Sequence, residues 1–366
     1  MQNLLIITEA FPPTLNSSSK LIDELCIELT KKGKTISVLT EGESAQANNY
    51  IHNGSFVTVV PGLFSKKRGF IIRGIRELFM PIIFGIYAYR LNREKNFDGV
   101  FIYSPPLTVG LCKFFLQKTP SILNIQDIFP QHAKDLGIIS SNVIFKFFQR
   151  IQKIVYKKNN LLVCQSKESA KYIANLYPEF NRKISYILNW QSFNKNKFFA
   201  DQSYEPSRQL ELVYCGNIGP AQDLIGFISN PIYQSLSCRL NIYGEGVDKV
   251  KLVNFIKQNS LVGISVHDAV PQSELSKIFS GKSMGLVTLA KESSTPIMPG
   301  KILTYAEHGL PVLAFGSKHS KLSGFLEKEK IGLFIDASSS AKNEENSLEA
   351  LSSIHFKHKK SSNDLK

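Results

Sequence analysis

The sequence is poor in cysteine, and its cysteines show none of the spacings that mark a metal site or a disulfide framework. The five stand at Cys26, Cys112, Cys164, Cys215 and Cys238, an odd number with no Cys-x-x-Cys pair among them. Isolated thiols of this kind are typical of reduced core cysteines in a cytosolic protein. We therefore expect a cytoplasmic protein without disulfides and without a metal site.

Long hydrophobic runs are also missing. The longest uncharged stretch beside a hydrophobic peak, residues 78–89, has 12 residues and contains Pro81. A transmembrane helix needs about 20 apolar residues, so this stretch fits a membrane interface or a protein core instead. The chain reaches its first apolar run, residues 4–7, without a basic segment or a cleavage site, so we expect no secretion signal.

Acidic residues are few beside the basic ones. Lysine and arginine number 44 against 30 aspartates and glutamates, which gives a net charge of +14. Such a surface attracts phosphates, anionic lipid or nucleic acid. Aromatic side chains are not interleaved with the basic residues as base stacking requires, so nucleic acid is the least favoured partner.

Basic residues at 66–68, Arg73 and Arg76 precede the apolar stretch 78–89. Basic next to apolar is the composition of a helix lying in a membrane interface, where it would make peripheral contact with anionic lipid. A core helix with a solvated basic end has the same composition. The sequence favours neither.

The length of 366 residues predicts two domains. Short apolar runs alternate with helical patterns, and the near-continuous apolar strands fit parallel sheets covered on both faces. Predicted strands cover residues 4–8, 35–40, 56–60, 99–103, 121–125, 161–164, 184–188, 211–215, 240–243, 264–267, 285–289 and 311–315, and predicted helices 18–32, 66–93, 142–158, 247–258, 273–279 and 301–308. We divide the chain into an N-terminal domain (1–192), a linker (193–208), a C-terminal domain (209–340) and a basic polar tail (341–366).

The loop after the first predicted strand ends at a helix N-terminus, where open α/β sheets bind ligands. Asn16, Ser17 and Ser18 offer hydroxyl and amide groups there, and Lys20 adds charge. These groups can hold a phosphate or an acceptor hydroxyl. A plain capped helix explains them equally well.

Asp127 follows the strand 121–125 at the same carboxyl edge, and His132 stands five residues later. A carboxylate in that place can act as a base or orient an acceptor hydroxyl. A loop acid or histidine is more often a cap or a surface residue.

Two glycine-containing turns follow strands of the second half. They are Gly216-Asn217-Ile218-Gly219 and Gly244-Glu245-Gly246. Small residues let a ligand approach the backbone closely. Neither turn is a dinucleotide fingerprint, and most such glycines only make turns. The evidence for a ligand site is that the two turns recur at equivalent strand ends.

Pro299-Gly300-Lys301 opens the helix predicted at 301–308. A lysine in a first turn is disfavoured by the helix dipole. It is reasonable there if an anion binds at that N-terminus, because amides and ammonium together stabilise a diphosphate leaving group. An exposed lysine of no consequence is the alternative.

Taken in order, these motifs resemble glycosyltransferase family 4, of GT-B fold, and in particular the branch that assembles bacterial O-antigen, capsule and colanic acid. The matching text is Phe11-Pro12-Pro13, Ser104-Pro105-Pro106-Leu107-Thr108-Val109-Gly110, Gln126-Asp127, Asn189-Trp190, Gly216-Asn217-Ile218-Gly219 with Gln222, Gly244-Glu245-Gly246, Val270-Pro271 with Glu274, and Pro299-Gly300-Lys301 through Gly309-Leu310-Pro311-Val312.

The resemblance implies two Rossmann-like doubly wound domains facing a central cleft and retaining, metal-independent sugar transfer without a cofactor. The co-substrate is a UDP- or GDP-linked sugar, and the acceptor a polyprenyl-diphosphate-linked glycan at the inner membrane. Lys301 and Asp127 are implied at the reacting centre. The implied donor side comprises Gly216, Asn217, Ile218, Gly244, Glu245, Val270, Pro299, Gly300, Lys301 and Thr304, and the acceptor side Asn16, Ser17, Ser18, Lys20 and His132.

The chain departs from the family pattern at several positions. The family's paired glutamates correspond to Pro296 and Thr304, and its diphosphate-binding arginine and lysine to Asn217 and Gln222. A catalytically silent GT-B protein that binds nucleotide sugar or a partner enzyme is therefore one alternative. A sugar-nucleotide epimerase, which shares fold and ligand but needs no acceptor, is another.

Overall fold

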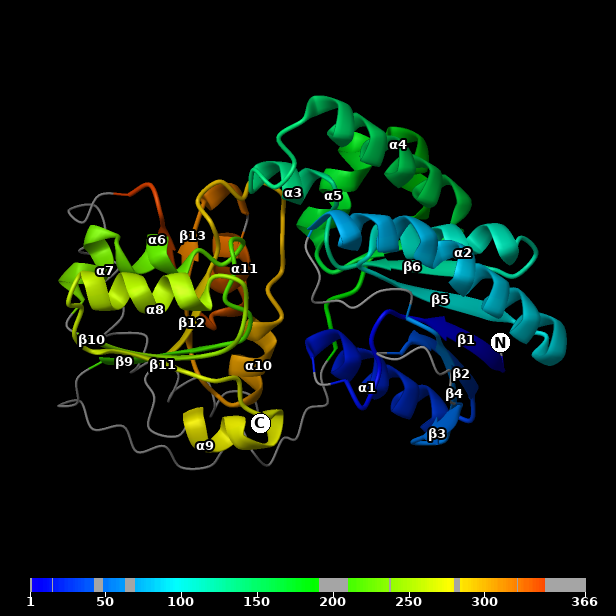
Figure 1. The fold of residues 1–366 in the computed structure, drawn as a ribbon, viewed down its shortest axis with the longest axis horizontal. Coiled ribbons are helices and arrows are strands. Elements are labelled where there is room, and N and C mark those ends of the chain that lie inside the picture. Colours follow the sequence, from blue (N-terminus) through cyan, green and yellow to red (C-terminus); the bar gives the residue numbers. More distant parts are fainter. Residues whose placement is uncertain are drawn as a thin grey trace. The chain divides into compact units, whose positions relative to one another are not determined.

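The chain divides into two compact units, Met1–Ser192 and Phe193–Lys366 (Figure 1). The computed structural model describes residues 2–14, 16–42, 49–62, 70–190, 210–236, 238–279, 284–320 and 322–339, without the side chains of 70–75 and 272. The predicted linker 193–208 and tail 341–366 lie outside the described residues.

Unit 1 is built on an eight-stranded sheet of order β3-β4-β2-β1-β5-β6-β7-β8, parallel except for the pair β3–β4. The strands are β1 (Asn3–Ile7), β2 (Thr35–Glu41), β3 (Tyr50–His52), β4 (Ser55–Val60), β5 (Gly99–Ser104), β6 (Ser121–Ile125), β7 (Leu161–Cys164) and β8 (Ile184–Tyr186). The helices are α1 (Ser17–Lys31), α2 (Phe70–Lys95), α3 (Gln131–Asp135), α4 (Asn142–Lys158) and α5 (Lys167–Leu176), with 3-10 helices η1 (Leu107–Phe115) and η2 (Pro178–Lys183).

Strand β1 shows why this sheet needs helices on both faces. Leu5 and Ile7 point into the core shared with α2, η1 and α4, whereas Ile6 points into the core shared with α1. Successive side chains of a strand alternate between faces, so a run of buried apolar residues requires cover on both. The strand order reverses at β1, which pairs with β2 on one side and β5 on the other.

Unit 2 repeats the scheme with six parallel strands in the order β11-β10-β9-β12-β13-β14. The strands are β9 (Leu210–Cys215), β10 (Cys238–Tyr243), β11 (Ile264–His267), β12 (Met284–Thr288), β13 (Val312–Gly316) and β14 (Gly332–Asp336). The helices are α6 (Leu224–Ile228), α7 (Pro231–Ser235), α8 (Lys249–Gln258), α9 (Leu275–Phe279), α10 (Lys301–Glu307) and α11 (Leu322–Glu329), with 3-10 helices η4 (Gln272–Glu274) and η5 (Lys318–Ser320). This is a doubly wound order whose reversal lies between β9 and β12.

The predicted α/β class with two doubly wound domains is confirmed. Each predicted strand and each predicted helix has a counterpart within a few residues, and α4 and β6 match to the residue. The prediction omitted the short strand β3, the last helix and strand, α11 and β14, and several short helices. No helix in the described part of the chain is both long enough and apolar enough to cross a membrane.

Candidate functional site

The strongest candidate site lies in unit 2, at the carboxyl ends of β9 and β12. Open α/β sheets bind ligands at this edge where the strand order reverses. Strand β9 ends at Cys215 and runs into Gly216, and α10 begins nearby at Lys301. The sequence predicted Gly216 and Lys301 as parts of one site, although 85 positions separate them, and the fold brings them into contact.

Helix α10 is fixed to the sheet by Tyr305. Its hydroxyl accepts a hydrogen bond from the Cys215 amide at 3.0 Å and donates to the Leu286 carbonyl at 3.1 Å. Gly285 makes room for the ring, because a Cβ there would lie 2.3 Å from Tyr305 Cγ. Lys301 stands four residues earlier and therefore on the same side of the helix. The hydrogen bonds of Tyr305 therefore place Lys301 at the end of β9.

The Lys301 side chain lies across the end of β9. Its Nζ is 4.5 Å from the centroid of the Tyr214 ring. A Cβ at Gly216 would stand 2.7 Å from Lys301 Cε, and Gly216 has a φ of +134°, which side-chain-bearing residues rarely adopt. Glycine is required at 216 for the backbone and for the lysine stem.

Lys301 is a desolvated cation without a counter-charge. Burial lowers its pKa to about 8, an effect that the neighbouring Cys215 partly opposes. The Cys215 thiol itself stays protonated, since burial raises its pKa to about 12. Among the described residues no carboxylate forms an ion pair with Lys301. Buried charges are normally paired, so this ammonium is suited to an incoming anion.

Asn217 and Gln222 extend the same edge. Asn217 is exposed, and its side-chain amide donates to Gln222 Oε1 at 2.9 Å. The Asn217 carbonyl accepts from the buried Tyr214 hydroxyl, which fixes the backbone of the turn. The two amide side chains present polar groups, but no charge, beside Lys301.

The second glycine turn packs closely against the first. A Cβ at Gly244 would lie 2.0 Å from the Gly216 carbonyl oxygen, and one at Gly246 would lie 2.1 Å from the Ile218 carbonyl oxygen. The Ile218 amide donates to the Glu245 carbonyl at 2.8 Å. Glycine at 244 and 246 is therefore explained by the packing of the two turns, and the place of Gly244 at the donor stays a prediction.

The Ile218 side chain is 1% exposed and belongs to the core of unit 2, and its place at the donor stays a prediction. The Glu245 carboxylate accepts from Lys249 at 2.6 Å, and Val270 packs against the core of α10.

The remaining predicted donor residues begin α10. Gly300 is its exposed N-cap, and its carbonyl accepts from the Thr304 amide at 3.3 Å, while the Pro299 carbonyl accepts from the Ile302 amide at 3.1 Å. Thr304 is half-buried one turn after Lys301.

In unit 1 the loop after β1 caps α1. The Asn16 side chain accepts from the Ser19 amide and from the Ser18 hydroxyl, both at 2.8 Å. Lys20 pairs with Glu24 at 3.4 Å, whereas Ser17 is exposed. The capping explanation therefore accounts for Asn16 and Ser18, and the acceptor role of this loop stays a prediction.

Asp127 lies exposed just past β6, and His132 lies half-buried in α3. His132 Nδ1 is buried without a hydrogen-bond partner among the described residues. Burial lowers the pKa of His132, and the Asp127 carboxylate partly offsets that shift. The two predicted residues therefore interact electrostatically at this edge.

Beneath them, Gln126 and Asn189 exchange two side-chain hydrogen bonds, of 2.9 and 2.8 Å. The structure thus joins two segments, 126–127 and 189–190, that are separate in the sequence.

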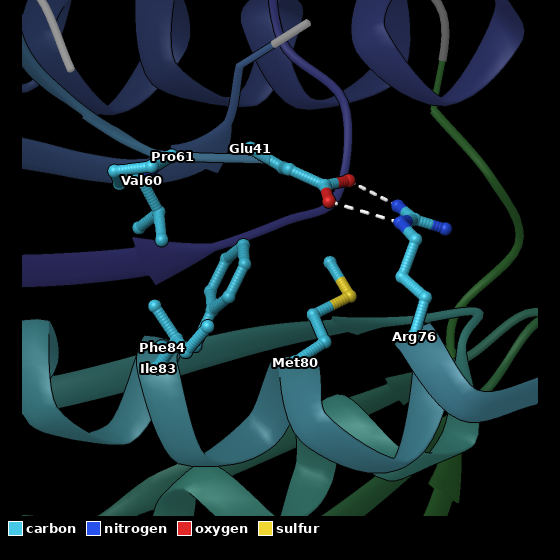
Figure 2. A pocket seen from close by; sticks show the side chains of 7 residues that line it. All are labelled: Glu41, Val60, Pro61, Arg76, Met80, Ile83 and Phe84. Carbon is cyan, nitrogen blue, oxygen red and sulfur yellow. Dashed lines mark hydrogen bonds and ion pairs between the residues drawn. The ribbon is translucent and has the colours of Figure 1, made fainter. Parts of the chain in front are cut away.

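The sequence left open whether Arg76 belongs to an interfacial helix or to the solvated basic end of a core helix, and the structure shows that this residue is not solvated. Its side chain is 3% exposed, and its guanidinium donates to both carboxylate oxygens of Glu41 (Figure 2). It also donates to Glu9 at 2.6 Å. Burial lowers the pKa of Arg76, but the hydrogen bonds to Glu41 and Glu9 outweigh this and raise it above its ordinary value. Residues 66–68 and the Arg73 side chain lie outside the described residues.

The sequence analysis did not predict the cluster of Arg76, Glu41 and Glu9, although the positions of the two glutamates after strands indicate it. Glu41 ends β2, and Glu9 stands two residues after the end of β1. Neighbouring parallel strands bring such residues to one edge. The buried guanidinium of Arg76 binds the carboxylates of Glu9 and Glu41. These contacts require that α2 pack against the edge of the sheet where β1 and β2 end.

Comparison with known proteins establishes the fold alone. No family model and no curated protein matches the sequence. Among solved structures, sucrose-phosphate synthase from Thermosynechococcus elongatus superposes with a TM-score of 0.72 at 10% identity, over 98% of this chain and 94% of that one. Anabaena Alr3699/HepE in complex with UDP-glucose superposes with a TM-score of 0.63 at 11% identity, over 97% of this chain and 93% of that one. WaaG, a glycosyltransferase involved in lipopolysaccharide biosynthesis, superposes with a TM-score of 0.61 at 10% identity, over 97% of this chain and 92% of that one. The chain has the GT-B fold.

Proposed function

We propose that this chain is a retaining glycosyltransferase that moves a sugar from a UDP- or GDP-linked donor to a lipid-linked glycan acceptor in cell-surface polysaccharide synthesis. The observation that carries the proposal is Lys301, a half-buried lysine that has no carboxylate partner among the described residues and lies at the ligand-binding edge of unit 2. The solved structures with this fold include one bound to UDP-glucose, which supports a nucleotide-sugar donor.

In the proposed reaction, the bond between the sugar's anomeric carbon and the donor diphosphate breaks while that carbon bonds to an acceptor hydroxyl. Negative charge accumulates on the leaving diphosphate. Lys301 stabilises that charge in a poorly solvated place, where electrostatic stabilisation is strongest. The exposed amide of Asn217 adds a hydrogen-bond donor.

Asp127 is proposed to orient the acceptor hydroxyl or to accept its proton. Its exposure at the carboxyl edge of unit 1 makes it available to a ligand. The scheme uses no metal and no cofactor, and Lys301 offsets one of the negative charges of the leaving diphosphate.

A lipid-linked acceptor requires the protein to work at a membrane surface. Helix α2 has apolar side chains on its exposed face that support peripheral contact with an anionic inner membrane on the cytoplasmic side. They are Leu78, Phe79, Ile82, Ile86 and Tyr89, each between 40% and 53% exposed.

The test is transfer of a radiolabelled sugar from a panel of UDP- and GDP-sugars into an extracted lipid fraction. The proposal expects incorporation that Lys301→Gln abolishes and Asp127→Asn strongly lowers, with UDP or GDP binding kept in Asp127→Asn. The exposed Lys257→Gln serves as control and keeps activity. Absence of transfer from every donor would sink the proposal.

A catalytically silent GT-B protein is the second candidate, favoured by Thr304 and Pro296, which stand where the family that the sequence resembles has glutamates. Calorimetric binding of a nucleotide sugar without turnover would favour it. Conversion of a UDP-sugar without acceptor, followed by mass analysis, would favour an epimerase.

A further inference from the structure

Unit 2 has a pocket of about 180 Å³ at the carboxyl ends of its last strands. The walls come from the loops that follow β12, β13 and β14, and the polar lining residues are Lys291, Ser317, Lys318, His319, Asp336 and Ser338. A water molecule takes about 30 Å³ of liquid volume, so about six would fit. Sites for drug-sized ligands begin at about 300 Å³. The pocket is therefore suited to a small ligand and not to a nucleotide.

This pocket is separate from the Lys301 site. Lys301 lies against Tyr214 and Gly216 at the end of β9, and the pocket lining contains neither of these two residues. In the sheet, β12 and β13 stand between β9 and β14. Open α/β sheets bind ligands outside the carboxyl ends of their strands, so the pocket occupies a second place along the same edge.

Side-chain hydrogen bonds fix two of the loops that form the walls. Ser317 is 8% exposed, and its hydroxyl oxygen accepts from the His319 amide at 3.2 Å. After β14, Asp336 Oδ1 accepts from the Ser338 amide at 3.1 Å and from the Ser338 hydroxyl at 2.9 Å. Such bonds between a side chain and the nearby backbone hold a turn in one conformation. The walls are therefore ordered before a ligand arrives.

Two lysines give the pocket its positive charge. Lys318 is exposed and forms no ion pair within the described part of the chain. The Lys291 side chain is 71% exposed, and its ammonium lies 3.9 Å from the carboxylate of Glu292. An ion pair so exposed contributes little, so Lys291 is available to an anion. Ammonium groups bind phosphate through strong charge-assisted hydrogen bonds.

Asp336 gives the pocket a second, different preference. Its Oδ1 is used by Ser338, whereas its Oδ2 accepts no hydrogen bond from any residue that the structure describes. A carboxylate oxygen repels phosphate but accepts from hydroxyl groups. The Ser317 hydroxyl accepts one bond, and its own hydrogen can be donated to a ligand. Two ammonium groups beside a carboxylate and a hydroxyl match a ligand that carries both a phosphate and free hydroxyls.

We propose that this pocket binds a small phosphorylated polyol, with the phosphate on Lys291 and Lys318 and a polyol hydroxyl on Asp336. The site is additional to the proposed donor site and uses none of its residues. It does not rest on sugar transfer, so its failure leaves the proposed enzymatic activity untouched, and the reverse also holds.

The test is calorimetric titration of the full chain with glycerol 3-phosphate, inorganic phosphate and glycerol. Glycerol 3-phosphate should bind at least about tenfold more tightly than inorganic phosphate, because Asp336 adds a hydrogen bond to a charged group. Glycerol should not bind at millimolar concentration, since it lacks the phosphate. Saturating UDP should leave the binding of glycerol 3-phosphate unchanged, because UDP is too large for the pocket.

A pair of substitutions tests the two lysines. Lys291→Gln with Lys318→Gln should weaken the binding of glycerol 3-phosphate at least about tenfold, because charged hydrogen-bond donors are lost. The matched control, Lys251→Gln with Lys257→Gln, changes two exposed lysines of α8 and should leave binding unchanged. A urea midpoint like that of the unaltered chain shows that each variant is folded.

Asp336→Asn tests the carboxylate, because it keeps an oxygen for Ser338 and removes the negative charge. It should tighten the binding of inorganic phosphate about threefold, since a repulsive charge disappears, and bring the two phosphate probes to about equal affinity. The proposal is overturned if the Lys291 and Lys318 pair binds glycerol 3-phosphate like the unaltered chain, or if Asp336→Asn fails to tighten inorganic phosphate. It is also overturned if glycerol 3-phosphate does not bind at millimolar concentration or if UDP displaces it.

Discussion

Replacement of Lys301 by methionine should stabilise the protein while it removes anion binding. The lysine's pKa falls from 10.5 to about 8 on folding, so the charged form costs about 3 kcal/mol at neutral pH, at about 1.4 kcal/mol per unit. The side chain keeps partial exposure, which makes this an upper limit. Methionine keeps the stem packed along Gly216 and over the Tyr214 ring, where its sulfur contacts favourably. We expect a gain of about 1–3 kcal/mol.

The pH dependence of the stability gain shows whether it comes from the desolvated charge of Lys301. Below pH 8 the lysine is charged in both folded and unfolded states, and the full cost is present. Between about 8 and 10.5 the folded state has lost a proton that the unfolded state keeps, so the stability of the unaltered chain rises with pH. Above 10.5 the lysine is neutral in both states. The advantage of Lys301→Met should therefore be greatest below pH 8 and vanish by pH 10.5.

Urea unfolding at pH 7 and at pH 10.5 measures this difference, and calorimetric titration with UDP and with GDP measures the loss of binding. Lys257→Met changes an exposed lysine of α8. It should alter neither the free energy of unfolding nor the free energy of UDP or GDP binding by more than about 0.5 kcal/mol. A Lys301→Met protein that is less stable at pH 7, or whose advantage is the same at both pH values, would refute the reasoning.

Three further outcomes follow from the same contacts. Affinity for the nucleoside diphosphate should fall as pH rises through about 8, where the buried ammonium loses its proton, as calorimetry at pH 7 and 9 would measure. Gly285→Ala should cost at least about 2 kcal/mol in urea unfolding and also weaken binding, because its methyl group would displace the Tyr305 ring; Gly324→Ala, with open space in α11, should be neutral or slightly stabilising. Arg76→Met should cost about 3–5 kcal/mol, because it removes the guanidinium that donates hydrogen bonds to the buried Glu41 carboxylate, and an unchanged urea midpoint would contradict this.

The sequence predicted the long elements well because their periodicity is strong. Helix α4 and strand β6 were predicted to the residue, and α1 was predicted within one residue at each end. Strand β14 and helix α11 were not predicted, because exposure along β14 is mixed and the helix is short. The five cysteines are unpaired, and four of them are buried.

Arg76 shows where local composition misleads. In the sequence it is one of several basic residues before an apolar stretch, and nothing nearby distinguishes it from the others. Its partners, Glu9 and Glu41, lie 67 and 35 positions away. Only the packing of α2 on the sheet decides that this cation is buried while apolar side chains after it, such as Phe79 and Ile82, are exposed.

The sequence by itself determined the α/β class, the two doubly wound halves and the position of Lys301 at a helix start, because strand and helix periodicities and end signals are local. The tertiary structure alone decided what surrounds that lysine. Gly216 and Tyr305 bring it against β9 without a counter-charge, and Gly244 accommodates a neighbouring backbone. Contacts between distant segments have no local signature, so glycines alike in sequence can accommodate a lysine stem at one turn and a carbonyl oxygen at the next.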